Sequence, residues 1–499
     1  MSKNSQTLLT SHDYLTGLHC RQLLWYLRHR PEKVQLTENS PSGTVPDAWE
    51  EVFRWAKTLY PGGVDVDWDG SGWDAALKLS EIVIRSPQVS YRVGVRYEGC
   101  FARTDILIPA ARANTWNLLL VKTSTGVKED HLREAAFQKW VLTHAGMKLG
   151  RIQQIHINGD YLRSKEIDPY KLLTKKDITL EIADYFEEVE ENVRILQSVL
   201  AEPDPPELNV VDDCDGLKGC PLFETCWNFL PPRHVFQLHA DSNRKRTYSL
   251  LRQGIHALSD IPEDFELTDK QRIQVTTEKT QKPYIDKEAI KSFLNLLEYP
   301  VYFLDFETFQ SPVPPYIHSR PWENIPFQYS LHRVDSPLGE IHHDMFLATG
   351  KEDPRPELLR QLKEKLGKTG SIVAYNAEFE TSRLKECATH FPQYRRWVEQ
   401  IRGRFVDLLE PFKNFHFYHP KQNGSASLKA TLPVLTGLRY DTLEISEGGE
   451  AGRQLLKLVF HSLPRKEEAK VRKHLEEYCR QDTEGMVYII RKLMSMAHD

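Results

Sequence analysis

The stretch "YFLDFET", residues 302–308, places two acids, Asp305 and Glu307, inside a run of apolar and aromatic residues. Such a run predicts a buried strand. Residues two positions apart on a strand point to the same face, so we expect the two carboxylates to project side by side. Two buried carboxylates are costly, and a divalent cation such as Mg²⁺, which prefers oxygen ligands, removes that cost. The alternative is a pair of acids at an exposed strand end, each in an ion pair.

Two later stretches add acids from other elements. "SIVAYNAEFETSRLKECATHF" predicts a strand over 371–375, a turn at Asn376 and a helix with Glu380 in its first turns. Near the end of the sequence, "YCRQD" puts Tyr478 and Asp482 four residues apart, on one face of a helix. Four carboxylates from three separate elements are typical of two-metal phosphoryl transfer, in which two cations activate the attacking water and stabilise the leaving oxygen.

At these residues the region resembles the DnaQ-like, or DEDD, exonucleases. The first family motif, D-x-E, is matched by Asp305 and Glu307, and the second, N-x-x-F-D, by "NAEFE", which ends at Glu380. The third motif of one subgroup, Y-x-x-x-D, is matched by Tyr478 and Asp482. The resemblance implies an RNase-H-like α/β fold and 3′→5′ hydrolysis of nucleic acid ends. It also implies that the four acids hold two Mg²⁺ or Mn²⁺ ions and that the tyrosine orients the attacking water.

The main departure from this pattern is Glu380, which stands where the family usually has aspartate. A glutamate still ligates metal, but its extra methylene changes its reach. Asp407, in "FVDLLEPF", is interpreted as a structural acid at a strand end, with an auxiliary role in the site as the alternative. Lys429, in "GSASLKATL", is interpreted as a solvated surface lysine, with a phosphate contact as the alternative.

The N-terminal region contains a second arrangement of possible catalytic residues. "CFARTDILIPA" (100–110) and "WNLLLVKTST" (116–125) predict two strands of a hairpin, which carry Asp105 and Lys122. The following stretch, residues 129–146, has the apolar spacing of an amphipathic helix.

This arrangement resembles the PD-(D/E)XK core of the RecB and CRISPR-associated exonucleases. In that class an aspartate, here Asp105, an acid-x-Lys motif ending at Lys122, and a helix bearing a glutamine, here Gln138, build a one- or two-metal site. The resemblance implies a restriction-endonuclease-like α/β core. Asp105 would ligate metal, and Lys122 would support the nucleophilic water or the scissile phosphate.

The acid of that acid-x-Lys motif is missing, because Leu120 stands two residues before Lys122. An apolar side chain cannot hold a cation. We therefore expect a degenerate centre that binds nucleic acid or serves as a scaffold. In the alternative, another acid replaces the missing one, with Glu134 of the helix as the first candidate and Glu98 or Glu51 as weaker ones.

Seven cysteines in a long chain without a secretory signal argue against a disulfide framework. Cys214, Cys220 and Cys226 cluster in "CDGLKGCPLFETC", and Cys20 lies far upstream. One distant and three clustered cysteines resemble the iron–sulfur nucleases of the same class, and four thiolates suit a [4Fe–4S] cluster that clips the domain together. Zinc and unligated thiols are the alternatives. The remaining cysteines are interpreted as ordinary buried residues, namely Cys100, Cys387 and Cys479.

The chain as a whole resembles a bacterial family of undescribed function that joins these parts. We expect a RecB-like domain over 1–230, a helical linker over 231–295 and a DnaQ-like domain over 296–499. Within the linker, "YSLLRQGIHALSDIP" (248–262) suggests a helix-hairpin-helix element, and the basic "NRKR" (243–246) favours phosphate contacts. An ordinary pair of short helices is the alternative.

Composition limits the function further. The net charge of −5 gives no global attraction to nucleic acid, so such binding must come from local basic patches. We find no apolar run long enough for a membrane span and no secretory signal, and we therefore expect a cytoplasmic protein without membrane partners. The resemblances described above imply a 3′→5′ exonuclease, DNA favoured over RNA, in DNA processing such as repair or phage defence, and this is the function that we expect. The alternatives are a nucleic-acid-binding or partner-recruiting protein with impaired centres, and a dual nuclease.

Overall fold

The structure is a computed structural model. It describes residues 8–35, 46–70, 72–86, 88–214, 219–440, 443–445, 448–460 and 463–498. The chain divides into two compact units. The first runs to Asn228 and includes Ser311–Trp322, and the second comprises Phe229–Gln310 and the chain from Glu323 onward. Both units combine helices with sheets, which confirms the predicted multidomain α/β class.

Within its described residues, the first unit contains a mixed six-stranded sheet in the order β2-β3-β6-β7-β8-β9. Its strands are β2 (Val64–Asp65), β3 (Ser90–Tyr91), β6 (Ile106–Pro109), β7 (Thr115–Val121), β8 (Lys148–Ile157) and β9 (Leu173–Asp177). A smaller sheet in the order β1-β5-β4 is formed by β1 (Leu9–Thr10), β5 (Cys100–Arg103) and β4 (Gly94–Tyr97). Strands β6 and β7 pair antiparallel, as the predicted hairpin requires, and β8 joins β7 in parallel.

The predicted strand over 100–110 was wrong in one respect, because it is divided between two sheets. Strand β5 ends at Arg103, and β6 begins at Ile106. At the break, the backbone N–H of Thr104 donates to the carbonyl of Val93, and the carboxylate of Asp105 accepts the N–H of Val121 at 2.6 Å. The carboxylate of Asp105 therefore takes the place of a backbone hydrogen bond between strands, at the point where the chain passes from one sheet to the other.

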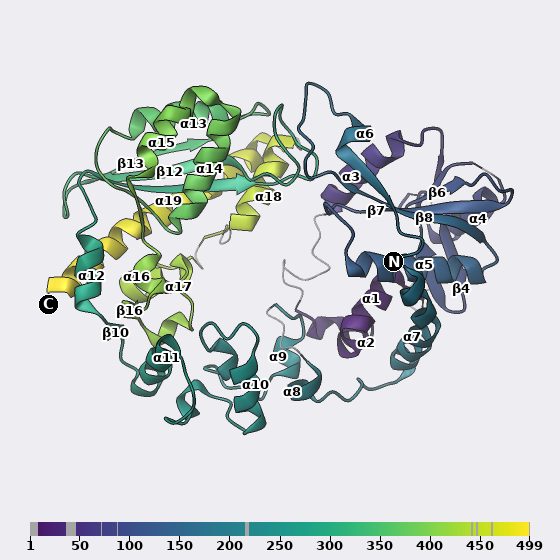
Figure 1. Cartoon of the computed structure of the whole chain (residues 1–499), viewed down its shortest axis with the longest axis horizontal. Coiled ribbons are helices and arrows are strands. Elements are labelled where there is room, and N and C mark those ends of the chain that lie inside the picture. The colour runs from purple at the N-terminus through teal and green to yellow at the C-terminus, as the bar shows by residue number, and fades with distance from the viewer. Residues whose placement is uncertain are drawn as a thin grey trace. The chain divides into compact units, whose positions relative to one another are not determined.

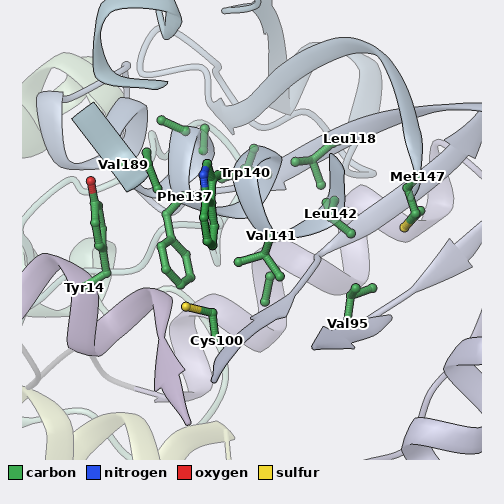
Figure 2. Close-up of a cluster of buried hydrophobic side chains, with 14 of the residues drawn as sticks. Tyr14, Val95, Cys100, Leu118, Phe137, Trp140, Val141, Leu142, Met147 and Val189 are labelled. Carbon is green, nitrogen blue, oxygen red and sulfur yellow. The ribbon is translucent and has the colours of Figure 1, made fainter. Parts of the chain in front are cut away.

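Helix α5 (Glu129–His144) is the central helix of the first unit and occupies the stretch that the sequence predicts to be helical. Its side chains Phe137, Trp140 and Val141 lie in a buried apolar cluster with Tyr14 and Leu118 (Figure 2). The other helices of the unit are α1 (Ser11–His19), α2 (Arg21–His29), α3 (Pro46–Thr58), α4 (Trp73–Ile84), α6 (Pro169–Leu172), α7 (Ala183–Ala201), α8 (Val210–Asp213) and α9 (Phe223–Cys226).

The second unit contains, in the part of the chain that the structure describes, a five-stranded sheet in the order β13-β12-β11-β14-β15. Figure 1 labels two of its strands, β12 and β13. Its strands are β11 (Val301–Phe309), β12 (Ile325–Val334), β13 (Ile341–Leu347), β14 (Ile372–Ala374) and β15 (Phe405–Asp407). The β13-β12-β11 pairs are antiparallel, whereas β14 and β15 continue the sheet in parallel with β11. The stretch that carries the first two acids is thus the central strand.

Helices cover both faces of this sheet. On one face, Leu304 and Phe306 of β11 pack in a core with α13 (Arg355–Lys365), α14 (Ala377–His390) and α15 (Arg395–Arg402). On the other face lie α19 (Arg465–His498) and α18 (Gly448–Phe460), which contact β11. Because side chains alternate along a strand, Asp305 and Glu307 project toward this second face.

The segment between the two predicted nuclease regions belongs to the second unit. It contains α10 (Lys245–Arg252), α11 (Asp269–Thr280), α12 (Lys287–Leu294) and β10 (Tyr284–Ile285), which pairs with β16 (Phe417–Tyr418). The suggested helix-hairpin-helix is incomplete. A turn at Gly254 follows α10, but the second helix is a short 3₁₀ turn, Leu258–Asp260. Pro262 disfavours helical backbone in the residue before it, which explains the early end.

No helix among the described residues is long and apolar enough to cross a membrane.

Candidate functional site

The candidate site of the second unit begins with the two acids of β11. Asp305 is partly buried, and Glu307 is 6% exposed. In the sheet they lie opposite Ser330 and Gln328 of β12, and a β-bulge follows Glu307. Bulges redirect side chains where regular strand pairing ends. Both carboxylates therefore lie among the last regularly paired positions before the bulge.

Glu380 reaches the same region from α14. The chain leaves β14 at Ala374, turns through Asn376 in the left-handed conformation (φ 72°) and enters the helix at Ala377, as predicted. Asparagine tolerates that conformation better than most residues. Glu380 is 2% exposed, and its Oε2 atom has no hydrogen-bond partner. The longer side chain at this position therefore still delivers a buried carboxylate, close enough to Asp305 for the two to interact electrostatically.

Helix α19 contributes Tyr478 and Asp482, which are 4% and 7% exposed. Between them lies Cys479, fully buried, whose Sγ donates to Oδ2 of Asp305 at 3.5 Å. The sulfur and one carboxylate oxygen each of Asp305 and Glu307 all lie within 4.8 Å of one another. The interpretation of Cys479 as an ordinary buried cysteine was therefore incomplete, because its thiol touches the acids.

Burial and mutual repulsion hold these carboxyl groups toward their neutral forms. Burial, and then the charge of Asp482, raise the pKa of Asp305 well above its usual value. Burial, and then Asp305, raise the pKa of both Glu307 and Glu380 well above the ordinary range. Burial raises the pKa of Asp482 to about 6, although a hydrogen bond from Tyr440 opposes the shift. The four acids thus form a buried, repulsive set, which is the state that a bound cation relieves.

Two residues that the sequence did not single out as ligands lie over this set. The hydroxyl of Tyr440 donates a short hydrogen bond to Oδ1 of Asp482. The Nζ atom of Lys429 lies 5.8 Å from the ring centre of Tyr440 and 5.6 Å from that of Tyr478. Lys429 is exposed, as predicted, yet its charge lowers the pKa of both Glu307 and Asp482. It therefore belongs to the site.

A pocket of about 700 Å³ is lined by Lys429 and by Tyr440, the residue that donates to Asp482. Its other lining residues are mostly basic or polar, namely His419, Lys421, Gln422, Asn423, Ser425, Ser427, Ala430, Pro433, Val434 and Arg439. Much of this lining comes from the loop before α17 (Leu428–Thr436) and from that helix. A cavity with several cations and hydroxyl groups suits an anionic ligand.

The structural interpretation of Asp407 agrees with its contacts. Its Oδ1 atom accepts the backbone N–H groups of Asn376 and Leu409, each at 2.9 Å. It thereby fixes the turn that leads into α14 and still interacts electrostatically with Glu380.

Helix α18 approaches the same strand closely. A Cβ on Gly452 would lie 2.9 Å from the carbonyl oxygen of Thr308, and one on Gly448 would lie 3.4 Å from Oε2 of Glu307. The first turn of this helix therefore lies beside the Glu307 carboxylate, and the glycines allow that approach.

In the first unit, Asp105 and Lys122 also come together with residues of α5. The Nζ atom of Lys122 donates to Oε2 of Glu134 at 2.6 Å, and Nε2 of Gln138 donates to Oε1 of the same carboxylate at 3.2 Å. Burial raises the pKa of Asp105 to about 6, with Lys122 and a backbone N–H opposing the shift.

Leu120 points elsewhere, since it is fully buried in the apolar core around α5. Of the acids considered as replacements, Glu134 acts on the pKa of Asp105. Glu51 interacts instead with Arg54 and Arg163, and Glu98 with Cys100. The structure therefore brings Glu134 to this centre, already paired with a lysine.

The four cysteines proposed for a cluster lie near one another. Cys20 precedes α2 and Cys226 ends α9, whereas residues 215–218 lie outside the described chain. All four are partly buried. Burial, and then Cys20, Cys220 and Cys214, raise the pKa of the Cys226 thiol to about 12. Four thiols close enough to repel as thiolates are a donor set that suits a metal or an iron–sulfur cluster.

Comparison with known proteins finds a family match for one part of the chain. Residues 302–427 match a family described as a domain of unknown function, DUF2779. This stretch contains the first and second acid motifs but ends before α19. The chain is also 29% identical over 213 residues to the uncharacterized protein MG366 homolog of Mycoplasma pneumoniae and 24% identical over 232 residues to the uncharacterized protein MG366 of Mycoplasma genitalium.

These alignments cover 39% and 42% of this chain. They cover 32% and 34% of the two relatives, so the matched part spans about a third of their length.

Proposed function

We propose that the second unit is a metal-dependent 3′→5′ exonuclease that acts on nucleic acid, with DNA favoured over RNA. The observation that carries this proposal is a set of four electrostatically coupled acids from three elements, the partly buried Asp305 and the buried Glu307, Glu380 and Asp482. Divalent cations such as Mg²⁺ or Mn²⁺, bound by these acids, would activate water and stabilise the leaving oxygen of a phosphodiester.

The donor set fits such cations for two further reasons. The Oε2 atom of Glu380 is buried without a partner, and the pKa of each of the four acids is raised chiefly by burial. An uncompensated buried carboxylate costs several kcal/mol, on the order of the penalty for a buried ion, unless a counter-charge is present. A strand with acids in these positions is difficult to explain as packing alone.

The surrounding residues would position the substrate. Lys421, Lys429 and Arg439 line the adjoining pocket and would contact phosphates, which supplies the local positive charge that an acidic chain otherwise lacks. Tyr478 lies beside the acids on α19 and would orient the attacking water, as the DnaQ-like resemblance implies. The mixed sheet, with acids on its central strand and on a covering helix, supports an RNase-H-like fold for this unit.

For the first unit we propose a RecB-like domain that holds a cluster through its four cysteines and binds nucleic acid. Lys122 and Glu134 neutralise each other there, which favours a degenerate centre. The same contact also supports the second candidate, a dual nuclease, because Glu134 stands beside Asp105 where an acid is missing. Complete loss of cleavage in variants of the second unit would favour a degenerate first centre, whereas residual cleavage would favour the dual nuclease.

The test uses the full chain, purified without oxygen, on end-labelled single-stranded DNA and RNA with Mn²⁺, Mg²⁺ or EDTA. Asp305→Asn is compared with Asp344→Asn, a control acid on β13 that is paired with Lys365. We expect metal-dependent shortening from the 3′ end in the wild type and in the control, and its loss in Asp305→Asn.

Cleavage that survives Asp305→Asn but disappears in Lys122→Ala would move the chemistry to the first unit. Binding without cleavage under every condition would refute the exonuclease and favour the recruiting role.

A further inference from the structure

The acid set of the second unit includes one atom that a purely carboxylate metal centre does not need. This is Sγ of Cys479, fully buried on α19 between Tyr478 and Asp482. Its neighbours within 4.8 Å are carboxylate oxygens of Asp305 and Glu307. Cys387, another buried cysteine of this unit, instead packs in the apolar core with α13 and α15.

We propose that Cys479 is a metal ligand, and that Asp305, Glu307 and Cys479 together hold one transition-metal ion of borderline softness, such as Zn²⁺, Co²⁺ or Fe²⁺, in preference to Mg²⁺. The inference rests on the proposed exonuclease site and specifies which ion one of its positions selects. Thiolate sulfur favours such ions, whereas Mg²⁺ takes oxygen ligands in octahedral geometry.

The distances agree with neighbouring ligands on one ion. Bonds of about 2.3 Å to sulfur and about 2.1 Å to oxygen, at angles between about 90° and 110°, place the two ligand atoms roughly 3.1–3.6 Å apart. The observed separation between Sγ of Cys479 and Oδ2 of Asp305 is 3.5 Å. On binding, a metal–sulfur bond would form and the thiol proton would leave to solvent, so the charge on the ion is partly balanced by the new thiolate.

A second observation points to a ligand at the same place. Oε2 of Glu380 is buried without a partner, and its carboxyl group interacts electrostatically with Asp305. A cation held by Asp305 would give this orphaned oxygen a counter-charge. A buried hydrogen bond from the thiol to Asp305 alone would leave that oxygen unsatisfied.

The experiment measures Co²⁺ and Cd²⁺ binding to the full chain by ultraviolet absorption, since metal–thiolate bonds give charge-transfer bands that carboxylates do not. Wild type is compared with Cys479→Ser and with the matched control Cys387→Ser. The four cysteines of the first unit are intact in all three proteins, so their contribution cancels in the difference spectrum. We expect the charge-transfer band of this site in the wild type and in Cys387→Ser, and its loss in Cys479→Ser, with Cd²⁺ affinity weaker by about tenfold or more.

Asp305→Asn keeps the cysteine but removes a charged ligand, and we expect it to lose the same band. This variant keeps the test decisive if Cys479→Ser folds poorly. A band of equal size in wild type, Cys479→Ser and Asp305→Asn would overturn the proposal and leave the thiol as a hydrogen-bond donor.

Cleavage assays separate this inference from the proposed function. A band that depends on Cys479, without any nuclease activity, would keep the metal site and refute the exonuclease. Cleavage whose ratio of rates with Co²⁺ and Mg²⁺ is the same in wild type and Cys479→Ser would keep the exonuclease and refute the thiol ligand. We expect that ratio to fall about tenfold or more in the variant.

Discussion

Replacing Asp482 by asparagine should stabilise the metal-free protein while abolishing its activity. The side chain is 7% exposed, and burial raises its pKa from 3.8 to about 6. That difference corresponds to about 3 kcal/mol by which the folded state is penalised once the group is ionised. Asparagine has nearly the same shape and keeps an oxygen to accept the hydroxyl of Tyr440, but it carries no charge.

The sign of the pH dependence follows from the raised pKa. Below about pH 4 the carboxyl group is protonated in both the folded and the unfolded chain, so the variant and the wild type should be equally stable. As the pH rises from about 4 to 6, the unfolded wild type ionises whereas the folded one stays largely protonated, so the wild type loses stability over this range. The stability advantage of Asp482→Asn should therefore grow between pH 4 and 6 and remain constant above that range.

Hydrogen-exchange mass spectrometry of α19 peptides in EDTA would measure the free energy of unfolding in the second unit alone. A gain of about 3 kcal/mol at pH 8 corresponds to a rise of about 6–12 °C in Tm. Mn²⁺ should reduce the difference, because it stabilises the wild type by about 2.7 kcal/mol at a concentration of 100 times Kd. Asp407→Asn is the matched control, since that carboxylate accepts two backbone N–H groups and should give no gain.

A variant Asp482→Asn that is no more stable than the wild type at pH 8 in EDTA would refute the reasoning that the acids repel without compensation.

Three other substitutions test separate parts of the structure. Tyr440→Phe removes a hydrogen bond that lowers the pKa of Asp482, so the acidic limb of the pH–rate profile with Mn²⁺ should move to higher pH; an unchanged limb would contradict this role. Cys20→Ser should lose the visible absorption of an iron–sulfur cluster in anaerobically purified protein and keep 3′→5′ cleavage. Lys122→Ala removes the counter-charge of Glu134 and leaves it only the hydrogen bond from Gln138, so hydrogen exchange in α5 should show a loss of up to about 3–5 kcal/mol, with cleavage retained.

The elements that carry the acids could be predicted from sequence because their signals are local. An apolar run marks β11, the asparagine turn marks the start of α14, and a four-residue spacing places Tyr478 and Asp482 on one helix face. Each of these patterns spans fewer than about ten residues, the range over which periodicity and turn chemistry are informative.

The contacts that complete the site are long-range and have no such signal. Tyr440 meets Asp482 across 42 residues of sequence, and Cys479 meets Asp305 across 174. The cysteine lies three residues before Asp482, on nearly the same face of α19, and this spacing was the one available sign of its position. The break in the strand over 100–110 was also hidden, because Thr104 and Asp105 interrupt a run whose composition favours strand throughout.

The two acid centres differ in how their charges are balanced, and this difference supports the roles that we propose for them. In the first unit the opposing charge is Lys122, which contacts Glu134 and lowers the pKa of Asp105. A cation entering there would have to displace an ion pair that is already formed. In the second unit the opposing charge comes from Lys429, which is exposed and therefore screened by water, so the pKa of Glu307 stays well above its usual value. This difference in charge balance supports our proposal that the second unit, rather than the first, binds the catalytic metal.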